Sequence, residues 1–208
     1  VKAKGQGGDY YFENIKINNL DDGYSILTKG EFNRISVDKL LYEFDDFEQT
    51  YINSNQIKGE ISSAFKASFF INPSKSFDLK SLTFNSDNSF QHVKLIDYNY
   101  IAEIVDYFDE SMITRNIVDI PYYKQKSKKI IFKPFRNNMS FKDGKLNISP
   151  TYLENNMLNL NLKGTQTISD SVDYYMSFNW KEIKKRNKKE KEDYLEEKEE
   201  IKELFLRI

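Results

Sequence analysis

The sequence predicts a mainly β protein, an extended antiparallel sheet accompanied by two short amphipathic helices. Three observations lead to this prediction. Apolar and polar residues alternate along many segments, as they do in strands that bury one face. Asp-Gly pairs at Asp22-Gly23 and Asp143-Gly144 suit the tight turns of β-hairpins. Apolar residues recur at helical spacing in only two segments of the chain.

The first part of the chain is expected to begin with strands and continue into a helix. Ile15 and Ile17 alternate with polar neighbours, and a strand over residues 24–36 follows the first Asp-Gly turn. Residues 37–48 are predicted to be helical, because apolar side chains recur there three and four positions apart. Ser36 precedes this segment and is a residue type that caps helix N-termini well.

Strand patterns return after this helix. Residues 57–71 return to a period of two, with Ile57, Ile61, Phe65, Ala67, Phe69 and Ile71 on one face, and end before Pro73, which cannot donate to a ladder. Two further strands are expected over residues 78–85 and 90–96. The second helix is predicted over residues 99–112, where one face collects the apolar residues Ile101, Ile104, Val105, Phe108 and Met112.

The remainder is expected to be β structure again. Strands are predicted over residues 116–120 and 129–135, and a hairpin surrounds the second Asp-Gly turn. Alternating segments over residues 157–167 and 172–180 predict two more strands.

The last part of the chain differs in kind. Residues 181–203 are almost all charged, basic first and acidic later. They predict a charged surface insertion, because they offer too few apolar side chains to pack on a core. The chain begins with Val1 rather than Met, and its final apolar run, residues 204–208, looks like the start of a strand. We therefore expect a single region, residues 1–208, that is an excerpt of a longer protein.

The composition argues against several classes of function. The formal net charge is -1, so no overall field favours nucleic acid. Cysteine is absent and His92 is the only histidine, which argues against disulfides, thiol chemistry and Cys- or His-ligated metal sites. No apolar run reaches the ~20 residues that a membrane-spanning helix needs.

Carboxylate-rich stretches do not combine into a catalytic or metal site. Asp45 and Asp46 belong to the polar side of the first predicted helix, where charged side chains face solvent. The two Asp-Gly turns lack the ligand spacing and the bidentate Glu of a calcium loop. The sequence therefore predicts no catalytic residue, no metal site and no cofactor, and the protein is not expected to be an enzyme.

The apolar faces of the strands need a cover. Two short helices are too little to cover a sheet of eight or more strands. Either the sheet folds on itself as a closed sandwich, or it leaves an apolar trough open. Such an exposed apolar surface is typical of lipid or partner binding.

The order of motifs over residues 129–180 carries a family resemblance. A strand leads to a Lys-Asp-Gly-Lys-Leu hairpin at residues 142–146, and a strand of alternating leucines ends in a Gly-Thr pair. An Asp-Tyr pair lies in the next strand, and a Lys-rich insertion and the run LFLRI complete the series. This series resembles the C-terminal region of AsmA-like proteins, in particular the Bacteroidota type. The helix and strand near residues 40–71 and the helix near residue 105 resemble the same family.

The resemblance implies a fold and a role. AsmA-like proteins are anchored in the inner membrane and extend into the periplasm, and they are related to TamB-type and bridge-like lipid transfer proteins. Their antiparallel sheet curls into a taco-like groove with an apolar interior. The resemblance therefore implies a non-catalytic groove that supports phospholipid transport between inner and outer membranes and outer-membrane biogenesis. The anchor is absent from this chain, and the implied partners are phospholipid acyl chains and outer-membrane assembly proteins, with no nucleic acid.

The alternation near the C-terminus selects candidate residues for the lining of this groove. They are Leu146, Ile148, Leu158, Leu160, Leu162, Val172, Tyr174, Met176 and Phe178. Two alternatives remain open. The chain could be an assembly scaffold for outer-membrane proteins that acts through its strand edges. It could also be a secreted β-sandwich that binds glycans through paired tyrosines such as Tyr10-Tyr11 and Tyr122-Tyr123.

Overall fold

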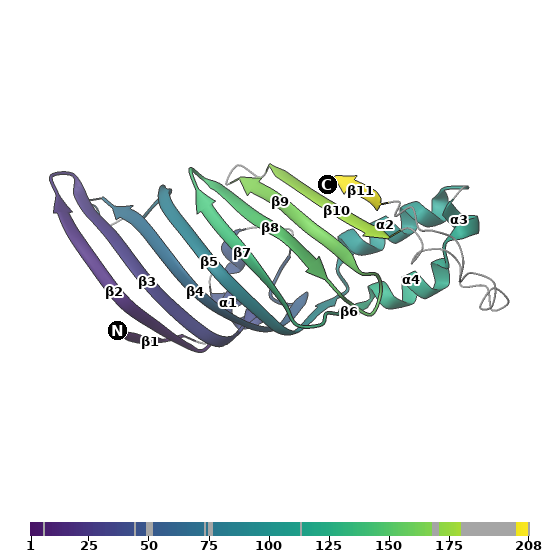
Figure 1. Ribbon diagram of the computed structural model, residues 1–208, viewed down its shortest axis with the longest axis horizontal. Helices are drawn as coiled ribbons and strands as arrows, with labels where there is room; N and C mark the ends of the chain where they lie inside the picture. The colour runs from purple at the N-terminus through teal and green to yellow at the C-terminus, as the bar shows by residue number, and fades with distance from the viewer. Residues whose placement is uncertain are drawn as a thin grey trace, which may run out of the picture.

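The computed structural model describes residues 1–5, 7–43, 45–48, 52–72, 74, 77–112, 114–167, 171–179 and 203–207. These residues form one antiparallel sheet of eleven strands with several short helices (Figure 1). The strands are β1 (Lys2–Lys4), β2 (Asp9–Leu20), β3 (Gly23–Ser36), β4 (Ile57–Ile71), β5 (Phe77–Ile96), β6 (Lys129–Ile131), β7 (Phe135–Lys142), β8 (Lys145–Leu153), β9 (Leu160–Thr167), β10 (Val172–Asn179) and β11 (Glu203–Arg207). The prediction of a mainly β protein with an extended antiparallel sheet is confirmed.

Neighbours in the sheet are neighbours in the sequence. The order is β1-β2-β3-β4-β5-β7-β8-β9-β10-β11, and β6 adds to β5 beside this path. β7 pairs with Phe84–Phe90 of β5, and β6 pairs with the Lys94–Ile96 end of the same strand. The chain between β5 and β6 therefore leaves the sheet, forms helices and returns to the same edge of β5.

The β7–β8 hairpin has the turn that its sequence predicts. Asp143 and Gly144 both have positive φ, 51° and 71°, as a type I′ turn requires. Phe141 and Leu146 face each other across the two strands. The turn thereby fixes the register of β8, and with it the face on which its apolar side chains lie.

The helices are α1 (Val37–Glu43), the 3-10 turn η1 (Asp45–Glu48), α2 (Asn99–Glu110), α3 (Thr114–Ile117) and α4 (Ile120–Ser127). The first predicted helix starts at its expected residue but ends at Glu43, with η1 covering part of the remainder. The second spans 99–110 rather than 99–112. Of the predicted insertion over residues 181–203, residues 181–202 lie outside the described part of the chain, and Glu203 begins β11.

The strand predicted over residues 116–120 is wrong, because Asn116 and Ile117 end α3 and Ile120 begins α4. The Asp119 side chain accepts a hydrogen bond from the backbone N–H of Tyr122 at 3.3 Å, which caps the N-terminus of α4. Pro121 lies in the first turn, where its missing N–H costs nothing. These two local signals outweigh the β-branched residues Ile117, Val118 and Ile120 around them.

The strand pairing divides the sheet into two faces, because residues directly opposite each other in a ladder project to the same side. One face, called the apolar face here, carries no charged side chain among its register-paired residues. Its members are Tyr10, Phe12, Ile15 and Ile17 of β2; Ile26, Thr28, Gly30 and Phe32 of β3; Ile61, Ser63, Phe65, Ala67 and Phe69 of β4; Phe84, Ser86, Asn88 and Phe90 of β5; Phe135, Asn137, Met139 and Phe141 of β7; Leu146, Ile148, Thr151 and Leu153 of β8; Leu160, Leu162, Gly164 and Gln166 of β9; and Val172, Tyr174, Met176 and Phe178 of β10.

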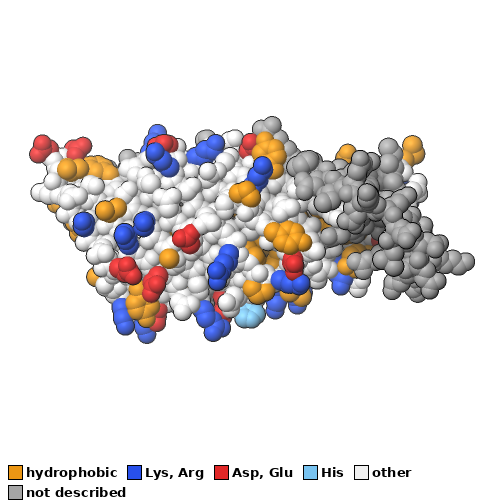
Figure 2. Space-filling model, in the orientation of Figure 1, with side chains coloured by type: hydrophobic (Ala, Val, Ile, Leu, Met, Phe, Trp, Pro, Cys, Tyr) orange, Lys and Arg blue, Asp and Glu red, His pale blue; other side chains and the backbone are white. Residues whose placement is uncertain are grey.

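The opposite face, called the polar face, carries the charges. Lysines and carboxylates alternate there with Asn, Ser and Thr, and Figure 2 shows them scattered over the side of the sheet turned to the viewer. Paired residues of this face include Lys29, Lys66, Asn85, Ser140, Asn147, Thr165 and Asp173. Among the register-paired residues, the charged side chains therefore all lie on one side of the sheet.

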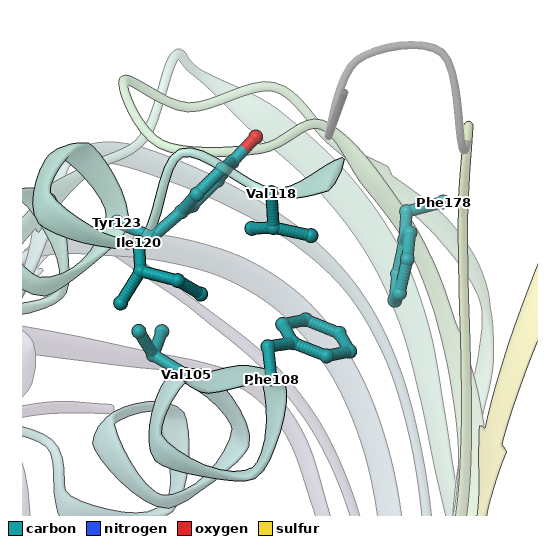
Figure 3. Close-up of a cluster of buried hydrophobic side chains, with 6 residues drawn as sticks. All are labelled: Val105, Phe108, Val118, Ile120, Tyr123 and Phe178. Atoms are coloured by element: carbon teal, nitrogen blue, oxygen red, sulfur yellow. The ribbon is translucent and has the colours of Figure 1, made fainter. Parts of the chain in front are cut away.

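Helices cover part of the apolar face. Val105 and Phe108 of α2 pack with Val118, Ile120 and Tyr123, and this cluster rests on Phe178 of β10 and Leu160 of β9. Figure 3 shows Phe178 reaching from its strand toward Phe108. Lys124 of α4 donates to Asp109 of α2 at 2.8 Å on the outer side of the helices.

Farther along the sheet, α1 packs against β3 and β4, next to the fully buried Ile35. In Figure 1, α2, α3 and α4 lie at the β10 end of the sheet, and α1 lies near β4. The sheet itself is open, with β1 and β11 at opposite ends, and it is neither closed nor strongly curled. The expected curling into a taco-like groove is therefore not confirmed.

Candidate functional site

Eight of the nine candidate residues from the sequence lie on the apolar face. Leu146 and Ile148 come from β8, Leu160 and Leu162 from β9, and Val172, Tyr174, Met176 and Phe178 from β10. The ladder pairs Leu162 with Met176 and Leu160 with Phe178, so the strands bring these side chains together in rows. Leu158 precedes β9 and packs against the cluster of α2 and α4.

The nine residues divide into a covered and an open group. Phe178 is 6% exposed, and Leu158 and Leu160 pack against the helices. Met176 lines a small apolar cavity of about 70 Å³ between these helices and the sheet. Leu146, Ile148, Leu162, Val172 and Tyr174 are half-buried, and none of them belongs to the helix-packed cluster. These five side chains therefore belong to the part of the apolar face outside the helical cluster.

Tyrosines mark the border of the open part. The Tyr174 hydroxyl donates to Oε1 of Gln166 at 3.0 Å, so its polar end is held along the sheet. Burial, with smaller contributions from the neighbouring Tyr100 and Tyr174, raises the pKa of Tyr98 to about 12. This tyrosine therefore stays neutral at physiological pH and adds no charge next to the apolar face.

A polar row crosses the apolar face, and the sequence did not predict it. Ser63, Asn88 and Asn137 stand opposite one another on β4, β5 and β7, with Ser86 one step along β5. Nδ2 of Asn88 donates to Oγ of Ser86 at 3.0 Å and to Oδ1 of Asn137 at 3.2 Å. Ser63, Ser86 and Asn88 are buried, at 4%, 6% and 5% exposure. We call these four residues the polar row.

The polar row was not predicted because its sequence has the composition of a turn. Residues 86–89 read Ser-Asp-Asn-Ser, which favours a turn and separates the two strands predicted there. The structure instead contains one continuous strand, Phe77–Ile96. The signal that could have found it is the alternation itself, because Phe84, Ser86, Asn88 and Phe90 keep a period of two through the polar stretch.

The polar face also has a hollow, of about 980 Å³, over the middle of the sheet. Side chains at its border include Lys29, Lys66, Asp87, Asn138 and Tyr175. Nδ2 of Asn138 donates to Asp87, and Lys163 Nζ stands 5.6 Å from the ring centre of Tyr175. The charges are mixed in sign, so the hollow has no strong preference for one class of ion.

The paired tyrosines do not form one exposed aromatic surface. Tyr10 lies on the apolar face, whereas Tyr11 pairs with Glu31 on the other side. Tyr123 is buried in the helical cluster, and the Tyr122 hydroxyl donates to the backbone oxygen of Asn156 at 3.2 Å. Stacking of a sugar on these pairs has no support in this arrangement.

Several titratable groups of the described residues form surface ion pairs, such as Lys124 with Asp106 and Asp109. His92 is exposed, and its Nδ1 lies 3.8 Å from Glu60. Among the described residues no group of three or more His, Cys, Asp or Glu could hold a metal ion. None of the described helices has the length and hydropathy to cross a bilayer.

Searches of protein-family models, curated proteins and solved structures find no match to the chain.

Proposed function

We propose that the apolar face binds the acyl chains of phospholipids. One observation carries the proposal: the register-paired residues of this face include no charged side chain from β2 to β10. Beyond the part that the helices cover, Met139, Phe141 and Leu146 are half-buried and lie outside the helical cluster. A soluble protein rarely leaves such a surface without a ligand or partner.

The energetics favour hydrocarbon as the occupant. Burying a methylene contributes about 0.8 kcal/mol, so an acyl chain gains several kcal/mol on a surface that excludes water from it. A charged side chain on the same surface would have to be desolvated at a large cost, and the described face has none. Neighbouring strands lie about 4.8 Å apart, so the face spans roughly 30 Å from β3 to β10. That is about the thickness of the hydrocarbon core of a bilayer, and hence of two acyl chains end to end.

The proposal extends to the role of the whole protein. The chain would be the C-terminal part of an AsmA-like protein of the periplasm, anchored to the inner membrane by a segment outside this chain. Its apolar face would form the floor of a groove for phospholipids that move between the two membranes, in support of outer-membrane biogenesis. The support for this role is the motif series of residues 129–180, together with the absence of charge from the face.

Adjacent residues of β7 provide the test. Met139 is half-buried on the apolar face, and Ser140 projects to the polar face. Met139→Asp should lower the loading of phospholipid from phosphatidylethanolamine–phosphatidylglycerol vesicles at least tenfold, because the carboxylate must be desolvated under the acyl chain. Ser140→Asp adds the same charge to the opposite side and should leave loading unchanged.

Loading is measured by mass spectrometry of lipid that co-purifies with the protein, and circular dichroism confirms that both variants fold. Equal loading of the two variants would reject the apolar face as the lipid site. No lipid on the unmodified protein would reject the function itself.

The strand-edge scaffold keeps one observation in its favour. Strand β1 pairs only with Asp9, Tyr10 and Tyr11 of β2, and no described strand pairs with residues 14–20 on that edge. Ile15 and Ile17 are 44% and 62% exposed there. Such an edge is a template for strand addition. A photo-crosslinker at Lys16, but not at Lys66 of the interior strand β4, should then capture an unfolded outer-membrane barrel protein.

A further inference from the structure

The polar row places four amide and hydroxyl side chains within a face that is otherwise largely apolar. Its members could have been apolar at no cost in strand structure, because the same-face positions before and after the row on β4, β5 and β7 are apolar. These positions are Ile61 and Phe65, Phe84 and Phe90, and Phe135 and Met139. Phe90 and Phe135 stack one step along the strands, with ring centres 4.7 Å apart and planes at 11°. Phe65 and Phe84 stack on the other side, at 6.0 Å. Two aromatic bands therefore flank one band of amides and hydroxyls.

The hydrogen bonds within the row leave donors unused. Asn88 donates both hydrogens of Nδ2, one to Ser86 and one to Asn137. Asn137 accepts through Oδ1, so its own Nδ2 is turned away, and no acceptor for it is found among the described residues. Oγ of Ser63 is buried and has no hydrogen-bond partner in the described part of the chain. The row thus presents surplus N–H and O–H donors.

The charge of the surroundings limits what these donors can bind. No Lys or Arg stands among the register-paired residues of the apolar face, so a phosphate or carboxylate placed there would lack a cationic partner. An uncharged acceptor meets no such penalty. It must also tolerate hydrocarbon on both sides, because the aromatic bands begin about 7 Å away along each strand.

We infer that the polar row binds the ester carbonyl oxygens of a glycerolipid, an inference that rests on the proposed function. The half-buried side chain of Asn137 donates to the carbonyl. The acyl chains then lie against the aromatic bands. The glycerol backbone of the lipid is thereby held at a defined place on the face instead of sliding along it.

A competition between two lipids tests the inference without any substitution. The complete chain is incubated with vesicles that contain equal amounts of dioleoyl phosphatidylcholine and its dioleyl ether analogue, which lacks both carbonyls. Mass spectrometry then gives the ratio of the two lipids bound. We expect the ester lipid to be enriched about tenfold, as one hydrogen bond in an apolar setting supports.

Two variants assign the preference to the row. Asn137→Leu keeps the size of the side chain and removes its donor, so the ratio should fall to one while total loading persists. Asn138→Leu makes the same change on the next residue, which projects to the polar face, and should keep the ratio of the unmodified protein. Thermal melting verifies that both variants fold.

Each outcome has one meaning. Equal binding of ester and ether lipids by the unmodified protein overturns the inference and leaves the proposed function standing. A preference that survives Asn137→Leu also overturns it. No binding of either lipid rejects the proposed function, and the inference with it.

Discussion

Phe178 and Phe141 show how one residue type serves two purposes on the same face. Both belong to the apolar face, yet Phe178 lies under α2 and is 6% exposed, whereas Phe141 of β7 is half-buried and stands apart from the helical cluster. The first is a core residue and the second is surface available to a ligand. The fate of the side chain depends on what covers its strand.

Substitution of these two residues should separate core from ligand surface. Phe178→Ala opens a cavity in the helical cluster and should cost about 3–5 kcal/mol of unfolding free energy. Phe141→Ala removes the same atoms from a partly solvated position and should cost less than half as much. Urea unfolding monitored by circular dichroism measures both, and equal losses would mean that the middle of the face is a closed core.

The pKa of Tyr98 gives a second expectation at this scale. Burial favours its neutral form, so the folded-state pKa, about 12, lies above the unfolded value of about 10. The stability that this difference contributes is present below pH 10 and is lost as the pH rises from 10 to 12. Tyr98→Phe cannot ionise and should flatten the loss of stability over this range. An unchanged pH profile of urea unfolding would contradict this assignment of the alkaline transition.

At the scale of elements, α4 depends on a cap formed by its own sequence. Asp119 accepts from the N–H of Tyr122, and the helix carries Ile120 and Tyr123 into the cluster that covers Phe178. Loss of this cap weakens the helix and, through it, the cover of the β9–β10 end. Local capping and long-range packing are therefore coupled in this element.

Removal of the cap has a matched control. Asp119→Ala should lower the unfolding free energy by about 1 kcal/mol, because an N–H at the helix start loses its acceptor. Asp119→Asn retains an acceptor oxygen and should lose far less. Urea unfolding of the two variants measures the difference, and equal effects would show that the carboxylate acts through its charge or through other contacts.

The elements that the sequence predicted are those with a clear period. The β7–β8 hairpin and the alternation of β9 and β10 were predicted with their faces, and eight of nine candidate residues lie together on one of them. The strand wrongly expected at residues 116–120 and the break expected at 86–89 fail for opposite reasons. A capping residue turned an apolar run into a helix, and pairing with β4 and β7 held a turn-like run in a strand. Each cause left a weaker signal in the sequence, because Asp119 and Pro121 mark the start of α4 and a period of two continues through residues 84–90.

At the scale of the whole molecule, the strands lie side by side in sequence order, and each strand contacts little beyond its two neighbours. Strands β4 and β5 are paired on both edges, whereas residues 14–20 of β2 have a described partner only in β3. In such an arrangement local stability accumulates from neighbour to neighbour and is least at the ends.

Hydrogen exchange should reveal this gradient. Backbone amides of β4 and β5 should be protected most, and those of residues 14–20 should exchange fastest among the long strands. Mass spectrometry of peptic fragments resolves the strands. Equal protection of β2 and β4 would indicate that another strand, from a second copy or a partner, occupies the edge of β2.

The sequential strand order also bears on how the protein is made. A ribosome releases β2 and β3 before β4, so every new strand finds its partner already present at the edge of a growing sheet, and no completed pair must be reopened. Until the next strand emerges, the backbone N–H and C=O groups of the edge strand are unpaired, and the apolar face of that strand is exposed. Synthesis therefore exposes, one strand at a time, the kind of surface to which chaperones bind.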